Sequence, residues 1–156
     1  MGIISPKKLN NFSKAFIALL LILLSPILII ALFFYLLWGA ILYIAIWLTW
    51  RKQRLLFVYS DSPIWKEYIA TKVIPKLQKH AVILNWSERK AWKNSLAILA
   101  FRYFGGYRNF NPLALVFRPF RFAKDYRFYE AFKEFKHGKS GEVEKVLNEL
   151  FDDIRN

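Results

Sequence analysis

The sequence of 156 residues contains no cysteine and little that is typical of a catalytic or metal centre. The absence of cysteine excludes disulfides, Cys-ligated zinc, iron–sulfur clusters and thiol catalysis. No Gly-rich phosphate loop and no nucleophile elbow occurs along the chain. The two histidines, His80 and His137, have no metal-ligand spacing, and we interpret both as structural or solvated. The sequence therefore predicts no metal site and indicates no particular cofactor.

Residues 15–50 lack Asp, Glu, Lys, Arg, His, Asn and Gln altogether. Since a membrane helix needs ~20 apolar residues to cross ~30 Å of hydrocarbon, this stretch predicts a membrane segment. It separates a basic N-terminal tail, residues 1–14, from a basic domain, residues 51–156. One straight helix would be roughly 54 Å long, which exceeds the hydrocarbon thickness. Three arrangements stay open: one long span whose end enters the interface, two short spans, or a re-entrant hairpin.

Basic residues flank the membrane segment in equal number. They are Lys7, Lys8 and Lys14 before it, and Arg51, Lys52 and Arg54 after it. Because cytoplasmic flanks carry the excess of Lys and Arg, this balance favours a cytoplasmic location for both ends. Pro26 lacks an N–H and disturbs a helix; we interpret it as a kink in an ordinary spanning helix rather than a re-entrant bend.

Aromatic residues gather in the second half of the membrane segment, and Trp and Tyr prefer the headgroup level of a bilayer. The residues predicted to lie at the membrane interface are Trp38, Tyr43, Trp47, Trp50, Arg51, Lys52 and Arg54. Tyr43, Trp47 and Trp50 fall on one helical face. An interfacial belt is the simpler interpretation of this face, and a docking surface for the following domain is the alternative.

The net charge of +13 is concentrated in one part of the chain. Residues 1–14 carry +3, residues 51–139 carry +13 and residues 140–156 carry −3. Each juxtamembrane Lys or Arg adds about 1 kcal/mol of attraction to an anionic leaflet. The run from residue 117 to 129 interleaves aromatic and basic side chains, which suits core packing plus lipid contact. The predicted partners are the bilayer and its anionic lipid, with a protein partner left open, rather than nucleic acid.

The domain has an alternating rhythm of apolar strands and helices. Strands are predicted at residues 55–59, 81–84 and 113–117, and helices at residues 65–80, 88–103, 123–136 and 140–153. Continuous apolar strands separated by helices are typical of a parallel sheet covered on both faces. The expected fold is therefore α/β, a small doubly wound three-stranded parallel sheet of the flavodoxin type.

Ligands of such sheets bind outside the carboxyl ends of the strands. The three turns that follow the predicted strands supply the candidate ligand-binding residues: Ser60, Asp61, Ser62, Asn85, Ser87, Glu88, Arg118 and Arg121. The two arginines suit a phosphate or carboxylate, while Asp61 and Glu88 suit an acid, a base or a ribose ligand. Ser, Asp and Asn are also the commonest helix-capping residues, so capping alone is the competing interpretation. The catalytic residues, if any, stay unknown.

The domain resembles uncharacterised bacterial membrane-anchored proteins with Tyr-Ser-Asp-Ser-Pro and Leu-Asn-Trp-Ser-Glu segments, here residues 59–63 and 84–88. It is also similar, more distantly, to a Toll/interleukin-receptor (TIR) domain. Residues 58–61 resemble the first-strand box of that family. Residues 82–88, with Trp92, resemble the strand and helix that carry a nucleotide-cleaving glutamate in its enzymatic members. Past Trp92 the sequence reads Lys-Asn-Ser-Leu, without an acid. The resemblance therefore implies the fold class and an interaction role rather than NAD cleavage.

These patterns predict a protein of the bacterial inner membrane whose small, basic α/β domain faces the cytoplasm and lies against anionic lipid. We expect a binding or interaction role, and whether the chain is an enzyme is left open. The alternative function is an enzyme or binder that acts on a nucleotide or a phosphorylated lipid at the carboxyl edge of the sheet. Tethering of nucleic acid at the membrane is a third alternative.

Overall fold

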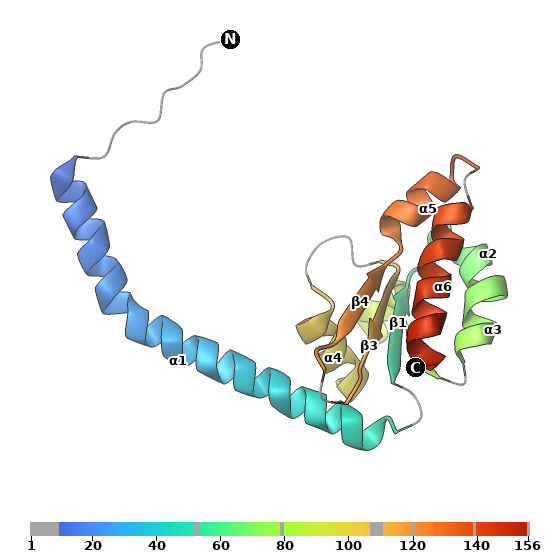
Figure 1. Cartoon of the computed structure of the whole chain (residues 1–156), viewed down its shortest axis with the longest axis horizontal. Coiled ribbons are helices and arrows are strands. Elements are labelled where there is room, and N and C mark those ends of the chain that lie inside the picture. The colour runs from blue at the N-terminus through green and yellow to red at the C-terminus, as the bar shows by residue number, and fades with distance from the viewer. Residues whose placement is uncertain are drawn as a thin grey trace, which may run out of the picture. The chain divides into compact units, whose positions relative to one another are not determined.

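The computed structural model of the chain describes residues 10–51, 54–78, 80–106, 111–119, 121–138 and 140–155 (Figure 1). The chain divides into two compact units, residues 1–39 and residues 40–156. The first unit holds most of helix α1, and the second unit holds the end of α1 and all of the sheet.

Helix α1 runs without interruption over Asn11–Thr49. Pro26 lies inside it, and the hydroxyl of Ser25 donates to the carbonyl oxygen of Ile22 at 2.9 Å. The helix bends within its first half, drawn in blue in Figure 1. A proline ring crowds the preceding turn and removes one hydrogen bond, which is a sufficient cause for such a bend. Residues 11–49 therefore form one long helix, with no turn of the kind that two short spans or a hairpin would need.

The apolar side chains of α1 are exposed around the whole helix over residues 16–41. Phe16 is 57% exposed, Leu23 65%, Phe33 61% and Ile41 50%. Within the part of the chain that the structure describes, Phe16–Thr49 is the one helix long and apolar enough to cross a membrane. None of its most apolar window is buried, whereas the core helix of a soluble protein is mostly buried. By length, composition and exposure, α1 is suited to be a membrane anchor.

The last two turns of α1 belong to the second unit and help to form its core. Leu42 and Ile46 are only 3% and 1% exposed. Ile46 packs in one cluster with Leu56 and Val58 of the sheet. The compact unit thus begins at residue 40, inside the apolar run, whereas composition alone had suggested a domain that begins at residue 51.

The sheet has four strands and is mixed. The strands are β1 (Leu55–Tyr59), β2 (Ala81–Asn85), β3 (Leu113–Val116) and β4 (Lys124–Arg127), in the spatial order β2-β1-β3-β4. β1 and β2 are parallel, whereas β3 is antiparallel to both β1 and β4. The α/β class is confirmed at this level, and the prediction of a three-stranded parallel sheet is wrong.

Strand β4 escaped the prediction because three of its four residues are charged. Only Tyr126 is buried there, while Lys124, Asp125 and Arg127 are exposed. Charged side chains are typical of an edge strand, which they protect from pairing with other chains. The segment was predicted to be the start of a helix at residue 123, but the helix begins only after the strand. A short connection from β3 to β4 leaves no room for a crossover helix, so the two strands are antiparallel.

The helices of the second unit are shorter and more broken than predicted. They are α2 (Lys66–Tyr68), the π-helical η1 (Ile69–Val73), α3 (Ile74–Leu77), the 3-10 helix η2 (Trp86–Ala91), α4 (Leu96–Phe104), α5 (Tyr129–Phe135) and α6 (Gly141–Arg155). The π turn directly precedes Pro75, which cannot donate an α-helical hydrogen bond. The helix predicted at residues 88–103 is split into η2 and α4, because Ser95 is extended and its hydroxyl accepts from the Ile98 amide, starting a new helix.

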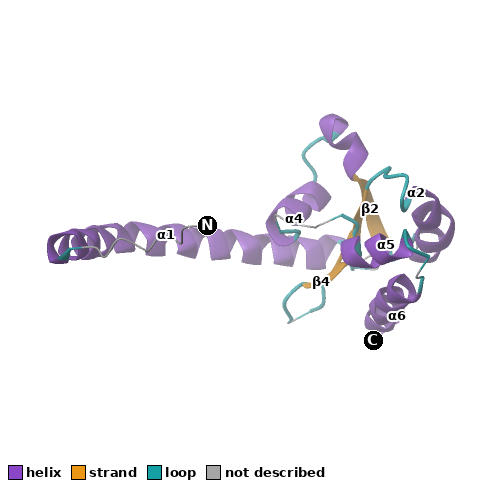
Figure 2. Ribbon diagram, turned by 90° about the horizontal axis from the view of Figure 1, so that it is seen from above, coloured by secondary structure: helices purple, strands orange, loops and turns teal. Residues whose placement is uncertain are grey.

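Helices cover both faces of the sheet (Figure 2). On one face, Leu55 and Phe57 of β1 pack with residues of η1, α3, α5 and α6. On the other face, Leu56 and Val58 pack with α4 and with Ile46 of α1. Alternate residues of β1 thus enter opposite halves of the core, which explains why this strand is apolar throughout.

The burial of Ile46 gives a direct test of the part that α1 plays in the core. Ile46→Ala should lower the free energy of unfolding of the second unit by about 2–4 kcal/mol, because it leaves a cavity. The measurement is thermal unfolding of the full chain in neutral detergent, followed by near-ultraviolet circular dichroism. The matched control is Ile44→Ala on the same helix, since Ile44 is 56% exposed. Equal effects of the two substitutions would contradict the packing described here.

Candidate functional site

The first two predicted turns meet at the carboxyl edge, which we define as residues 59–63 after β1 and residues 85–88 after β2. The amide group of Asn85 donates to Asp61 Oδ2 at 3.1 Å and to Glu88 Oε1 at 3.4 Å. The hydroxyl of Ser87 accepts from the Asp61 backbone N–H at 2.9 Å. Parallel pairing of β1 with β2 places Tyr59 opposite Asn85 and so brings these side chains together.

Most of these side chains cap local structure. Asn85 Oδ1 accepts from the Ser87 N–H at 3.0 Å and caps η2. The Ser62 hydroxyl accepts from the Ile64 N–H at 3.4 Å, and the Ser60 carbonyl oxygen accepts from the Trp65 indole at 3.1 Å. Capping therefore accounts for Asn85 and Ser62, whereas the carboxylates of Asp61 and Glu88 accept hydrogen bonds from the Asn85 side chain.

The electrostatics of the carboxyl edge are negative. The hydrogen bond from Asn85 lowers the pKa of Asp61, and Lys66, whose Nζ lies 3.4 Å from Asp61 Oδ1, adds to this effect. Burial raises the pKa of Tyr59, and the negative charges of Asp61 and Glu88 raise it further. Lys66 offsets the charge of Asp61, so the carboxylate of Glu88 leaves this edge with negative charge that disfavours a phosphate, and the edge is better suited to a neutral or cationic group.

Arg118 and Arg121 lie at the opposite edge of the sheet. They follow β3, whose last residue, Val116, pairs with Leu55, the first residue of β1. The end of β3 therefore lies beside the beginning of β1. The predicted convergence of all three turns is wrong for these two arginines, because it depended on a parallel third strand.

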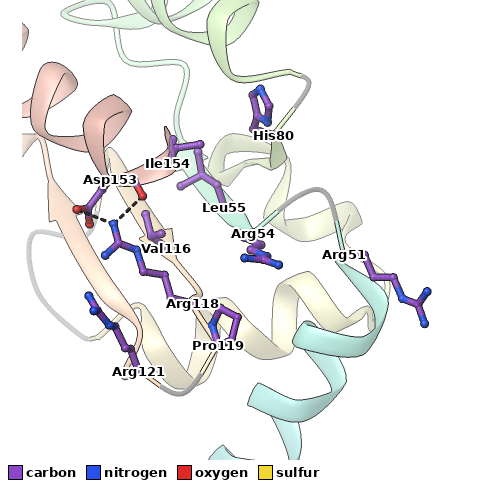
Figure 3. Close-up of a pocket in the computed structure, with 10 residues that line it drawn as sticks. All are labelled: Arg51, Arg54, Leu55, His80, Val116, Arg118, Pro119, Arg121, Asp153 and Ile154. Atoms are coloured by element: carbon purple, nitrogen blue, oxygen red, sulfur yellow. Dashed lines mark hydrogen bonds and ion pairs between the residues drawn. The ribbon is translucent and has the colours of Figure 1, made fainter. Parts of the chain in front are cut away.

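A basic pocket of about 560 Å³ opens at this opposite edge, and we call it the amino-edge pocket. It is lined by Arg51, Arg54, Leu55, His80, Val116, Arg118, Pro119, Arg121, Asp153 and Ile154 (Figure 3). Arg54 lies in the middle of the view, the side chain of Arg118 is drawn between Arg54 and Arg121, and the Arg51 guanidinium points away from all three (Figure 3). The pocket joins residues that the sequence had assigned to separate roles: a membrane flank, a turn and a structural histidine.

Arg118 is committed to an ion pair. Its NH2 group lies 2.7 Å from Asp153 Oδ1 and donates to the Asp153 carbonyl oxygen at 2.6 Å. Lys124 Nζ lies 3.2 Å from the other carboxylate oxygen of Asp153. Burial by itself would raise the pKa of Asp153. This effect is outweighed by hydrogen bonds from Tyr126 and Lys124 and by the positive charges of Arg118 and Lys124, so the pKa of Asp153 is lowered. This cluster fixes the end of α6 to the segment after β3.

The side chains of Arg51, Arg54 and Arg121 form no ion pair with a carboxylate of the described residues. The only acid that lines the pocket, Asp153, is neutralised by Arg118 and Lys124. Guanidinium groups offer several donors in a fork that matches phosphate and carboxylate. The amino-edge pocket can therefore accept an anion, which the carboxyl edge cannot do well. Sequence reasoning missed it because only the antiparallel β3 places Arg121 and Arg54 at the same edge of the sheet, where both line this pocket.

The predicted membrane-interface residues fall into two groups. Trp38 and Trp47 are 48% and 47% exposed, whereas Tyr43 and Trp50 pack against Phe117 with ring centroids 5.8 and 5.9 Å apart. Part of the aromatic face of α1 thus docks on the domain, as the alternative interpretation had it. Arg51 and Arg54 are exposed, and Lys52 lies outside the described residues.

Among the described residues no cluster of three His, Cys, Asp or Glu could hold a metal ion, and His137 is exposed after α5.

The cluster around Asp153 predicts a pH-dependent contribution to stability. Because the pKa of Asp153 is lowered in the folded state, its contribution is complete above the unfolded value of about 3.9 and is lost as the pH falls through the folded pKa. Asp153→Asn should cost about 1–3 kcal/mol at neutral pH and should lose less further stability on acidification than the wild type. Chemical denaturation of the full chain in detergent at several pH values measures this. The exposed neighbour supplies the control, Asp152→Asn, which should behave like the wild type.

Capping by Asn85 can be tested against ligand binding. Asn85→Ala should lower the free energy of unfolding by about 1 kcal/mol, because η2 loses its cap. Asn94→Ala, at an exposed position outside any helix, is the control and should have no effect. Both are measured by thermal unfolding. An Asn85→Ala variant as stable as the control would contradict the capping role and favour a ligand role.

Comparison with protein-family models, with curated proteins and with solved structures finds no match to this chain. The similarity to TIR domains and to proteins with the two short sequence segments therefore stays a prediction from the residues.

Proposed function

We propose that this protein is anchored by a single membrane span and that its α/β domain is a binding or interaction domain held against anionic lipid on the cytoplasmic face. The observation that carries this proposal is helix α1, whose apolar side chains are exposed all round over residues 16–41 and whose last two turns are part of the domain core. An anchor that is also a core element keeps the domain at the bilayer without a linker.

The length of the exposed part of α1 supports a single span. Residues 16–41 of a helix measure roughly 39 Å at ~1.5 Å per residue. This suits a hydrocarbon layer of ~30 Å with ordinary tilt and some extension into the interface. The whole apolar run was too long for one span, but Leu42 and Ile46 are buried by the domain and need no lipid.

Charge supports contact with anionic lipid and a cytoplasmic location. Arg51 and Arg54 directly follow the apolar run and line the amino-edge pocket, and residues 51–139 carry +13 in total. The two flanks next to the apolar run carry three basic residues each, so the cytoplasmic location is proposed from the larger positive charge of residues 51–139 rather than from the flanks. Basic residues close to a span favour the cytoplasmic side, and they are attracted by the negative surface potential of the cytoplasmic leaflet.

A binding role fits the second unit better than catalysis at the carboxyl edge. The acids there are engaged with Asn85 and Lys66, and their charge disfavours a phosphorylated substrate. The alternative of an enzyme or binder for a nucleotide or phosphorylated lipid would need Asp61 and Glu88 for ligand contact. An interaction role is also what the similarity to TIR domains implies.

Topology tests this proposal directly, because the chain has no cysteine of its own. Single cysteines at Ser13 and Ser140 are labelled in intact cells with a thiol reagent that does not cross membranes. A single span with a cytoplasmic domain predicts labelling at residue 13 and protection at residue 140 until the cells are opened.

The other outcomes of the topology experiment are equally informative. Protection at both positions would mean a hairpin or re-entrant segment and would contradict the single span. Labelling at residue 140 in intact cells would place the domain outside and would refute the cytoplasmic location. A cysteine-free chain treated in the same way gives the background.

A further inference from the structure

The connection between β3 and β4 carries an aromatic ring in an unusual position. Phe122 is 97% exposed, which makes it the most exposed large apolar side chain among the described residues. It follows Arg121 and precedes β4, which starts at Lys124. A fully exposed Phe among basic residues is costly in water but suits a bilayer interface, where the ring is buried and the cations meet lipid phosphates.

The same connection lines the amino-edge pocket. Arg118, Pro119 and Arg121 form one wall, and Arg51 and Arg54 contribute from the segment between α1 and β1 (Figure 3). Leu55, Val116 and Ile154 give the pocket an apolar floor. Arg118 is held by Asp153, so Arg54 and Arg121 are the cations available to an anion, with Arg51 at the rim. The pocket thus combines free guanidinium groups with apolar surface.

Contacts within the second unit place this connection beside the end of the apolar helix. The Tyr43 hydroxyl of α1 donates to the carbonyl oxygen of Arg118. The ring of Phe117 lies between Tyr43 and Trp50 of the segment that ends α1, with centroid distances of 5.8 and 5.9 Å. On the same two turns of α1, Ile44 and Leu48 are exposed and apolar. Phe122, the pocket and this apolar surface therefore belong to one region of the unit.

We propose that the connection between β3 and β4 is a second membrane contact, in which Phe122 inserts its ring at the level of the headgroups and Arg54 and Arg121 bind the phosphate of an anionic glycerophospholipid. This proposal rests on the proposed function, since it presumes that the second unit lies at the bilayer. It names the lipid group and the residues that bind it. Arg118 acts as a positioning residue, because its ion pair with Asp153 holds the wall of the pocket in place.

Lipid binding is tested with the full chain in neutral detergent by native mass spectrometry. Phosphatidic acid is the probe, phosphatidylcholine the neutral reference and inorganic phosphate the soluble competitor. Phosphatidic acid should bind more tightly than phosphatidylcholine. The double variant Arg54→Gln/Arg121→Gln should weaken its binding by about tenfold or more, because two cations close to the phosphate are lost.

A matched variant removes the same charge elsewhere. Lys90→Gln/Lys93→Gln changes two exposed residues that follow β2, at the other end of the sheet, and should leave the affinity for phosphatidic acid unchanged. If both double variants lost the same affinity for phosphatidic acid, the effect would be one of net charge, and the proposed binding at the amino-edge pocket would be refuted. Displacement of phosphatidic acid by an equal concentration of inorganic phosphate would identify a site for free phosphate instead. Thermal unfolding of both variants shows that each still folds.

Insertion of the connection is tested separately in nanodiscs of phosphatidylcholine and phosphatidic acid. A single cysteine at Phe122 carries an environment-sensitive fluorophore, and a cysteine at Asn94 carries the same label as control. The proposal predicts a blue-shifted emission and quenching by spin-labelled lipid at residue 122 but not at residue 94. A label at residue 122 that is as exposed to water as the label at residue 94 would overturn the membrane contact. The topology experiment decides the proposed function independently of this result. If the label at residue 122 stays in water while residue 140 is protected in intact cells, only the lipid contact is refuted, and the single span with a cytoplasmic domain is retained.

Discussion

The burial of one face of the last turns of α1 is the contact on which the rest of the structure depends. Ile46 and Leu42 are almost fully enclosed, while apolar residues on the same turns, such as Ile44, stay exposed. The helix therefore needs two different apolar environments, a protein core on one side and a nonaqueous medium on the other. The sheet face formed by Leu56 and Val58 would be incomplete without this helix. The long apolar helix and the domain core are in this sense built from one element.

The direction of β3 decides which residues can act together. A parallel β3 would have brought Arg118 and Arg121 to the acids of the carboxyl edge and formed a site of mixed charge. The antiparallel β3 separates the charges instead: Asp61 and Glu88 gather around Asn85 at one edge, and the arginines gather at the other. Because the acids lie at the other edge, the amino-edge pocket has more basic than acidic side chains, and two of its arginines belong to the segment that follows α1. The direction of one strand thus places the acids and the arginines at opposite edges of the sheet.

The sequence predicted those elements whose signals are local. β1 was predicted over the residues that form it, because five apolar residues end at a Ser-Asp-Ser-Pro turn, and α6 was predicted because its apolar face repeats with helical period. β4 was missed, since Lys-Asp-Tyr-Arg has one apolar side chain and its pairing with β3 is a tertiary effect. The proximity of Asp61 to Asn85 followed correctly from parallel pairing. The presence of Arg54 and Arg121 in the lining of one pocket depends on a strand direction that no local pattern encodes.

The part that α1 plays in the domain core also has a consequence for how the protein is made and destroyed. A protease that cut the chain after Trp50 would release a fragment with the sheet face around Val58 and Phe117 uncovered on one side. Such a fragment would expose a large apolar patch and would tend to aggregate or to be degraded rather than persist in solution. For the same reason, the domain can complete its core only once the end of α1 is available to it.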